Sequence, residues 1–324
     1  MRIQLLFLLL SSHIGSSLLG QTIPLPHPSE GRIERQESFP SRYVPARHVD
    51  IWLPDGYSPR KRYDVWYFHD GQMLFDSTVT WNKQEWGVDE TFSMLMERKK
   101  IRNCIVVGIW NSGAERHSEY FPQKPFEALP QGFRDSLLAM GKRNGNIPLF
   151  ATNVRSDAYL KFITEELKPW VDAHYSTKKG RKHTFIAGSS MGGLISMYAI
   201  SEYPDVFGGA VCLSTHWPGI FSLENNPIPD AFVAYVRQHA PSPKSHKLYF
   251  DHGTEGLDAM YGLIQLRIWE ALKEKGYQQL KSLSIGVVPG TDHSEHAWSK
   301  RLSVPIKFMY GASDAPKYKW QPVE

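Results

Sequence analysis

Short apolar runs of strand character alternate with helical patterns along most of this chain of 324 residues, and this alternation restricts the fold more than any other feature. The strand-like runs lie at residues 63–68, 102–110, 183–187, 209–213, 247–250 and 282–288. The helical patterns lie at residues 88–98, 158–174, 193–203, 259–275 and 294–309. Such alternation predicts an α/β fold, in which a mostly parallel central sheet carries helices on both faces.

Two segments depart from this order. Residues 32–39 and 43–53 alternate apolar and polar side chains, which predicts a hairpin at one edge of the sheet. Residues from about 122 to 153 combine Pro, Gly and mixed charges, and we interpret them as an insertion. The sequence leaves open whether this insertion walls the functional site or is a passive surface excursion. Because ligands of open parallel sheets bind beyond the carboxyl ends of the strands, catalytic side chains are expected in the loops that follow them.

The composition fits one enzyme-sized domain. Apolar residues make up 41% and charged residues 22% of the chain, and no Gly/Ser or Pro repeat divides its middle. We therefore expect a single α/β domain over residues 28–318. The net charge of +4 comes from scattered Lys and Arg with short clusters such as 178–182, which indicates a solvated surface and no nucleic-acid partner.

The amino terminus has the pattern of a secretory signal. Met1 and Arg2 precede an apolar stretch from Ile3 to Leu10, and Ser, Gly and Leu follow it up to Gln21. This order predicts a signal peptide over residues 1–20, whose apolar run is too short to span a bilayer comfortably. We therefore expect a secreted or periplasmic protein without a transmembrane segment, and the cleavage position stays open.

The two cysteines, Cys104 and Cys212, both lie inside apolar runs of strand character. Such positions predict buried free thiols rather than a disulfide, and the spacing does not suit a metal site. We expect neither a metal ion nor a cofactor.

One motif points to nucleophilic catalysis. The run 183–187 leads through Gly188-Ser189-Ser190-Met191-Gly192 into a helical pattern. A G-x-S-x-G sequence between a strand and a helix predicts a sharp turn that exposes its serine, because residues without bulk at 188 and 192 let the backbone turn. Ser190 is therefore the predicted nucleophile. Ser189 is the rival hydroxyl, but its register would require glycines where Ala187 and Met191 stand.

A serine hydroxyl needs a general base at neutral pH, and with this motif the base follows the last strand. His293 lies there, whereas His296 falls inside the first turn of the following helix and is the weaker candidate. The acid that orients the base is expected after the penultimate strand, where Asp251, Glu255 and Asp258 lie. We select Asp258, with Glu255 as the alternative.

Two backbone amides are expected to bind the oxyanion that forms when the serine attacks. One belongs to Met191, the residue after the nucleophile, and the other to Gln72 or Met73 in the loop after the third strand. Gly71 lets the backbone of this loop approach closely. We choose Gln72 as the second donor, and we expect Asp70 and Gly71 to contact the substrate.

Several short motifs together resemble one family of hydrolases. They are His69-Asp70-Gly71-Gln72, Trp86-Gly87-Val88-Asp89, Val106-Val107-Gly108-Ile109, the Gly188–Gly193 turn, and Asp292-His293-Ser294-Glu295 with Trp298. Over nearly its whole length after the leader, the chain resembles the α/β-hydrolase family of enterochelin esterases, S-formylglutathione hydrolases, feruloyl esterases and mycolyltransferases. The resemblance implies the α/β-hydrolase fold and a serine esterase with Ser190 as nucleophile and His293 as base.

The resemblance also implies roles for residues around the site. His216 and Trp217, with Ser214, stand where such enzymes shape the acyl or alcohol pocket, although core packing explains Trp217 equally well. Arg116 and Glu119 are expected to form a buried ion pair beside the site.

The substrate stays open between a siderophore ester and an acylated or feruloylated carbohydrate. Export disfavours thioester hydrolysis, which is a cytosolic task. The alternative from a different class is a non-catalytic protein that binds a siderophore or a glycan. The intact order of serine, acid and histidine argues against that alternative.

Overall fold

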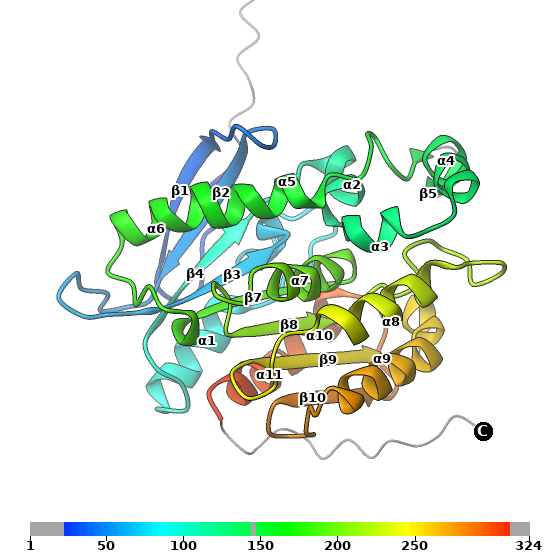
Figure 1. Ribbon diagram of the computed structural model, residues 1–324. Coiled ribbons are helices and arrows are strands. Elements are labelled where there is room, and N and C mark those ends of the chain that lie inside the picture. Colours follow the sequence, from blue (N-terminus) through cyan, green and yellow to red (C-terminus); the bar gives the residue numbers. More distant parts are fainter. Residues whose placement is uncertain (1–22, 144–146, 312–324) are drawn as a thin grey trace, which may run out of the picture.

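The strand-like runs form one eight-stranded sheet in the computed structural model, which describes residues 23–143 and 147–311. In spatial order the strands are β1 (Arg32–Phe39), β2 (Arg47–Leu53), β4 (Cys104–Ile109), β3 (Asp64–His69), β7 (Thr184–Ser189), β8 (Gly209–Leu213), β9 (Lys247–Gly253) and β10 (Leu283–Val288) (Figure 1). The first two form an antiparallel edge hairpin, and the strands from β4 to β10 run parallel. The predicted α/β fold with its edge hairpin is therefore confirmed.

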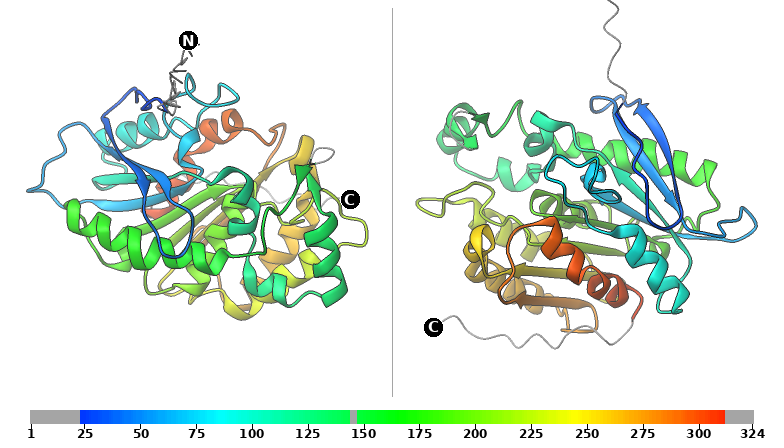
Figure 2. Two further views of the ribbon diagram at one scale, coloured as in Figure 1. Left: turned by 90° about the horizontal axis from the view of Figure 1, so that it is seen from above. Right: turned by 180° about the vertical axis from the view of Figure 1, so that it is seen from behind.

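Helices cover both faces of this sheet. One face carries α5 (Ser156–Lys161), α6 (Lys168–His174), α7 (Met191–Glu202), α8 (Ile228–His239) and α9 (Gly262–Glu274). A π-type turn, Phe162–Leu167, joins α5 to α6. The opposite face carries α1 (Val88–Glu97), α10 (Glu295–Arg301) and α11 (Ser303–Met309), seen in cyan, orange and red on the right of Figure 2.

The period of two along the strands creates two cores, one under each helical layer. In β3, Val65 and Tyr67 pack under α7, whereas Trp66 and Phe68 pack under α1, and all four are fully buried. Cys104 and Cys212, on β4 and β8, are buried free thiols, as predicted. None of the described helices is both long and apolar enough to span a membrane. The predicted signal peptide, residues 1–20, and residues 312–318 of the predicted domain lie outside the described residues.

The predicted insertion has regular structure of its own. After α2 (Arg116–Tyr120) it forms α3 (Gln123–Glu127), α4 (Gln131–Met140) and a short ladder of β5 (Lys142–Arg143) with β6 (Ile147–Pro148). Its apolar side chains Phe126, Leu129, Leu137 and Phe150 are buried in the core of the α7 face, and α3 packs against α8. The segment is thus anchored to the core, and its role at the functional site stays a prediction.

Candidate active site

The turn between β7 and α7 has the backbone that the G-x-S-x-G motif predicts. Ser190 has φ 58° and ψ −123°, in a left-handed region that costs an L-residue energy. A Cβ atom on Gly188 would lie 2.7 Å from the carbonyl carbon of Gly192, so only glycine fits there. The Ser190 amide donates to the carbonyl of Leu213 at the end of β8 (2.9 Å). The turn therefore holds Ser190 at the carboxyl edge of the sheet, partly exposed, while Ser189 stays buried in β7.

A histidine and a carboxylate meet at the same edge of the sheet. His293 follows β10, and Asp258 lies in a 3₁₀ turn (Gly256–Met260) after β9. The Nδ1 atom of His293 is 2.5 Å from Oδ1 of Asp258, whose side chain is fully buried. Glu255 is exposed, and its carboxylate accepts a hydrogen bond from Thr254 instead. Of the two predicted acids, the structure therefore brings Asp258 to the histidine.

Hydrogen bonds from the end of β8 connect to both the serine turn and the acid. The Ser214 hydroxyl donates to Oδ2 of Asp258 (2.5 Å), and the residue before it, Leu213, accepts the Ser190 amide. The His216 amide donates to the carbonyl of Ser190 (3.2 Å). Ser190, Asp258 and His293 therefore follow the parallel strands β7, β9 and β10, at one end of the sheet, and Ser214 follows β8 between them.

The environment of Asp258 keeps its carboxyl ionised. Burial alone would raise the pKa of Asp258, but hydrogen bonds from His293, Ser214 and the Gly253 amide outweigh it and hold the pKa below its usual range. An ionised carboxylate can only accept hydrogen bonds, so Nδ1 of His293 must carry the proton. The imidazole is thus left with Nε2 as the proton acceptor, which is the tautomer that a general base requires.

A buried network supports the acid from behind. The Ser214 hydroxyl accepts hydrogen bonds from Nε1 of Trp298 (2.9 Å) and from Nη2 of Arg301 (3.0 Å). Arg301 also binds both carboxylate oxygens of Asp251, at 3.0 and 3.1 Å. The expectation that Ser214 shapes the substrate pocket is therefore wrong, because its hydroxyl is fully buried against Asp258. Sequence reasoning missed Arg301, and its position one helical turn after Trp298 is the signal that points to it.

Replacing Arg301 with methionine is expected to lower the free energy of unfolding by about 3–5 kcal/mol, because the carboxylate of Asp251 would stay buried without its cation. Urea unfolding followed by fluorescence measures this loss. The matched control is Arg237→Gln, which removes an ion pair to Glu274 that is about half exposed and should cost less than about 1 kcal/mol. Equal losses in the two variants would contradict the role of Arg301.

The loop after β3 has the geometry of an oxyanion loop. Asp70 has φ 57°, and Gly71–Met73 form a single 3₁₀ turn. A Cβ atom on Gly71 would lie 2.4 Å from the carbonyl carbon of Gly108, so glycine is required by packing against β4. The Met73 amide donates to the carbonyl of Asp70 (2.9 Å), whereas no described backbone acceptor holds the amide of Gln72. Of the two predicted donors, Gln72 is therefore the one with its N–H available.

The carboxylate of Asp70 is fully engaged inside the protein. Arg116 binds its two oxygens at 2.7 Å each, and the Asn111 amide donates to Oδ1 at 2.7 Å. Burial alone would raise the pKa of Asp70, but the Arg116 guanidinium outweighs it and lowers the pKa. The contact between Asp70 and substrate stays a prediction. The observed contacts give Asp70 a role in fixing the loop beside Gly192: a Cβ atom added to Gly192 would lie 3.4 Å from Oδ2 of Asp70.

The predicted ion pair between Arg116 and Glu119 does not form. Arg116 pairs with Asp70, and Glu119 pairs with Arg47 at the start of β2 (2.7 Å). The two side chains leave the short helix α2 toward different strands, and each finds a buried partner there. The pair was implied by the family resemblance alone, and contacts with distant segments replace it in the structure.

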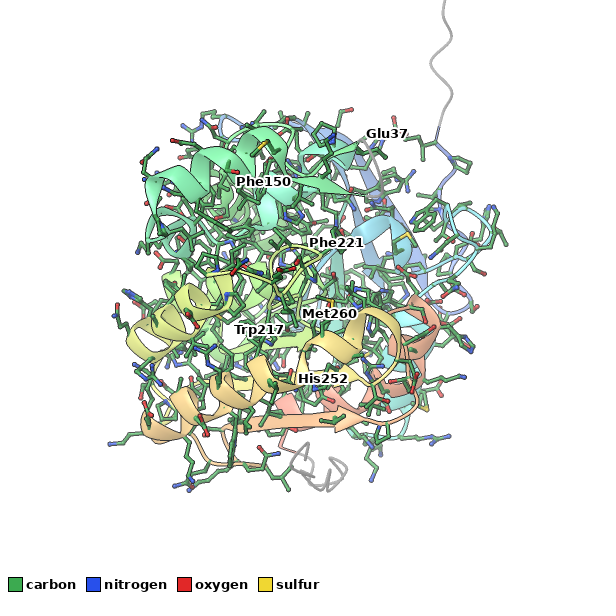
Figure 3. All side chains as sticks on the ribbon, turned by 90° about the vertical axis from the view of Figure 1, so that its right-hand side faces the viewer. Glu37, Phe150, Trp217, Phe221, His252 and Met260 are labelled. Atoms are coloured by element: carbon green, nitrogen blue, oxygen red, sulfur yellow. The ribbon has the colours of Figure 1, made fainter. Side chains whose placement is uncertain are left out.

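The two remaining predicted pocket residues lie deep. His216 is buried, and its Nδ1 is 2.9 Å from the hydroxyl of Tyr261. Trp217 is fully buried, and its ring packs 5.6 Å from Phe250 and 6.3 Å from Phe232, centroid to centroid. The structure thus supports core packing for Trp217. Figure 3 shows it below Phe221 of the following loop.

His69, at the end of β3, is a neutral histidine buried beside the site. Its Nδ1 is 2.9 Å from the hydroxyl of Tyr159, and burial lowers the pKa of His69 to about 3. Between pH 6.5 and pH 3 the unfolded chain therefore binds a proton that the folded chain does not, so stability falls as the pH falls. His69→Asn is expected to flatten this dependence by up to about 1.4 kcal/mol per pH unit. Urea titrations at pH 7 and pH 5 measure it; the exposed His239→Asn is the control, and identical slopes in wild type and His69→Asn would contradict the expectation.

A mostly parallel sheet with a serine at the turn after β7, an acid after β9 and a histidine after β10 is the arrangement of the α/β-hydrolases. Within that class, the chain belongs to the esterase family described as "Putative esterase", whose model matches residues 44–136 and 144–309. It is therefore a carboxylic ester hydrolase.

Similar proteins agree with this assignment. The ferri-bacillibactin esterase BesA of Bacillus subtilis is 25% identical over 199 residues, which cover 59% of this chain and 61% of BesA. The structure of a ferulic acid esterase from Anaeromyces mucronatus in complex with ferulic acid matches with a TM-score of 0.57 at 18% identity. The match covers 87% of this chain and 92% of the esterase chain. The ferric enterobactin esterase of Salmonella typhimurium has a TM-score of 0.57 at 17% identity, covering 88% of this chain and 59% of its own. The two structural likenesses show the α/β-hydrolase fold.

Proposed function

We propose that this esterase works through a serine nucleophile and an acyl-enzyme intermediate. Ser190 attacks the ester carbonyl while Nε2 of His293 accepts the hydroxyl proton, and the imidazolium then gives that proton to the leaving alcohol. Water, activated by the same histidine, releases the carboxylic acid and restores Ser190. The amides of Met191 and Gln72 bind the oxyanion of each tetrahedral intermediate. Asp258 holds the imidazole in the required tautomer.

The observation that carries this proposal is the hydrogen bond between His293 and the fully buried Asp258, at the edge of the sheet where Ser190 is partly exposed. A buried carboxylate whose pKa is shifted and which pairs with a histidine is typical of functional sites. The first amides of α7 add positive potential at the serine, because Met191 is at the amino end of that helix.

We propose a siderophore ester or an acylated or feruloylated carbohydrate as the substrate, met outside the cytoplasm if residues 1–20 direct export. The names of the similar esterases support this range. Exposed apolar side chains also stand near the site: Phe221 (47% exposed) follows β8, and Trp81 (83% exposed) lies in a loop that Asn82 ties to Glu295 through a hydrogen bond of 2.7 Å. Such side chains suit a substrate with an aromatic or apolar face.

Two experiments test the proposal. A fluorophosphonate probe is expected to label the wild type at Ser190 and to leave Ser190→Ala unlabelled. Turnover of p-nitrophenyl acetate, methyl ferulate, acetylated xylan and ferric enterobactin then ranks the substrate classes. An unlabelled wild type that turns over none of the four esters would refute the serine mechanism and favour a non-catalytic siderophore- or glycan-binding protein.

A further inference from the structure

A basic cavity lies at the amino ends of the parallel strands, the edge of the sheet opposite to Ser190. Its volume is about 830 Å³, and its walls come from the segments that precede β4, β7, β8, β9 and β10. The basic residues that line it are Arg102, Lys182, His183, Lys244, His246, Lys247, Lys275 and Lys281. No lining residue is acidic. Four of these segments, which are distant in sequence, therefore bring basic side chains to one recess, and the segment before β8 contributes only Gly208.

Asp64 is the one carboxylate that pairs with this set in the described structure, and it is fully buried. It binds Arg102 (2.7 Å), Lys178 (3.3 Å) and His183 (2.8 Å). Two permanent cations and a histidine therefore share a single negative charge, which leaves nothing to neutralise the lysines of the cavity.

The five lysines of the cavity form no ion pair within residues 23–143 and 147–311. Two of them bind carbonyl groups instead: Nζ of Lys247 donates to Phe308 (2.8 Å), and Nζ of Lys275 donates to Gln238 (3.2 Å). Lys247 is also half-buried, and burial lowers its pKa. Cations that share a concave surface raise its positive potential and attract anions. A bound anion would reduce the repulsion between the lysines, and it would replace the water that the Lys247 ammonium group loses on burial.

The remaining lining residues indicate the size and chemistry of the ligand. Phe185 and Met309 supply apolar walls, and Ser245, Gln278 and Ser282 supply polar groups. A volume of about 830 Å³ is that of a small-molecule site. Lysine ammonium groups bind phosphate and sulfate oxygens as point charges. We propose that this cavity binds a small multivalent oxyanion that carries phosphate or sulfate groups, at a site separate from the esterase centre.

Isothermal titration calorimetry with sodium tripolyphosphate, at constant ionic strength, tests this proposal. We expect saturable binding of one tripolyphosphate per chain in the wild type. The double variant Lys244→Gln/Lys281→Gln should weaken binding at least about tenfold, because two charged groups that would contact the anion are lost. The control, Lys161→Gln/Lys300→Gln, removes the same charge from exposed positions outside the cavity and should change the dissociation constant less than about twofold.

Three results would overturn the proposal: no saturable binding by the wild type, equal weakening in both double variants, or binding to phosphatidylglycerol vesicles without any binding of free tripolyphosphate. The esterase assignment is tested independently. Ser190→Ala should bind tripolyphosphate as tightly as the wild type, and Lys244→Gln/Lys281→Gln should hydrolyse p-nitrophenyl acetate at the wild-type rate. Loss of tripolyphosphate binding in Ser190→Ala would place the anion in the esterase centre and contradict a separate site.

Discussion

Replacing Ser190 with alanine is expected to lower kcat for p-nitrophenyl acetate by about 10⁴–10⁶-fold, because the covalent step loses its nucleophile while the rest of the site stays in place. Alanine accepts the same left-handed backbone about as poorly as serine does, so the turn at φ 58° should persist. Steady-state kinetics with purified protein measures the loss, and urea unfolding confirms that the variant is folded.

The neighbouring hydroxyl supplies the matched control. Ser189 is buried in β7, one residue before Ser190, and Ser189→Ala removes a side-chain hydroxyl of the same kind. We expect kcat of Ser189→Ala to stay within about tenfold of the wild type, since the site would lose less than about 1.4 kcal/mol of transition-state stabilisation. A Ser190→Ala enzyme that retains wild-type turnover would refute the assignment of the nucleophile.

Asp258→Asn is expected to lower kcat by about 10⁴-fold with a much smaller change in KM. An asparagine amide that points its N–H₂ toward Nδ1 of His293 would favour the tautomer with the proton on Nε2, which cannot accept the serine proton. The same change also removes the ionised acceptor of Ser214 and of the Gly253 amide. The kcat measured from pH 6 to pH 9 reports this loss directly.

Glu255→Gln is the comparison for this prediction. Glu255 lies three residues earlier in the same loop, carries the same charge and is exposed. We expect its kcat to match that of the wild type. If Glu255→Gln were the inactive variant and Asp258→Asn the active one, the acid would have to be reassigned despite its hydrogen bond to His293.

The sheet and the sharp turn at Ser190 were predictable because they depend on local patterns. Runs of apolar residues mark buried parallel strands, and two glycines around a serine mark a turn that other residues cannot make. Helix α8 was not predicted, although Ile228, Phe232, Val233 and Val236 have helical spacing. Prolines are typical of turns, and α8 starts after Pro227 and contains a second proline at position 229, so the sequence pattern indicated a loop there.

The supporting residues of the site depend on contacts between distant segments, which no local pattern contains. Asp258 and Glu255 lie three residues apart in one loop, and the tertiary structure separates them: Asp258 is buried and bonds to His293, whereas Glu255 is exposed. Arg301 reaches Ser214 and Asp251 across 87 and 50 positions of the chain. Interactions between such distant residues can be identified only once the order and register of the strands are known.

The proposed base and the residues that support its acid come from the last part of the described chain: His293 follows β10, and Trp298 and Arg301 lie on α10. A nascent polypeptide that has reached β8 already contains the complete serine turn, yet it has no proton acceptor for it. A fragment cleaved before residue 293 has the same defect. On the proposed mechanism, ester hydrolysis therefore requires the chain to be complete as far as α10.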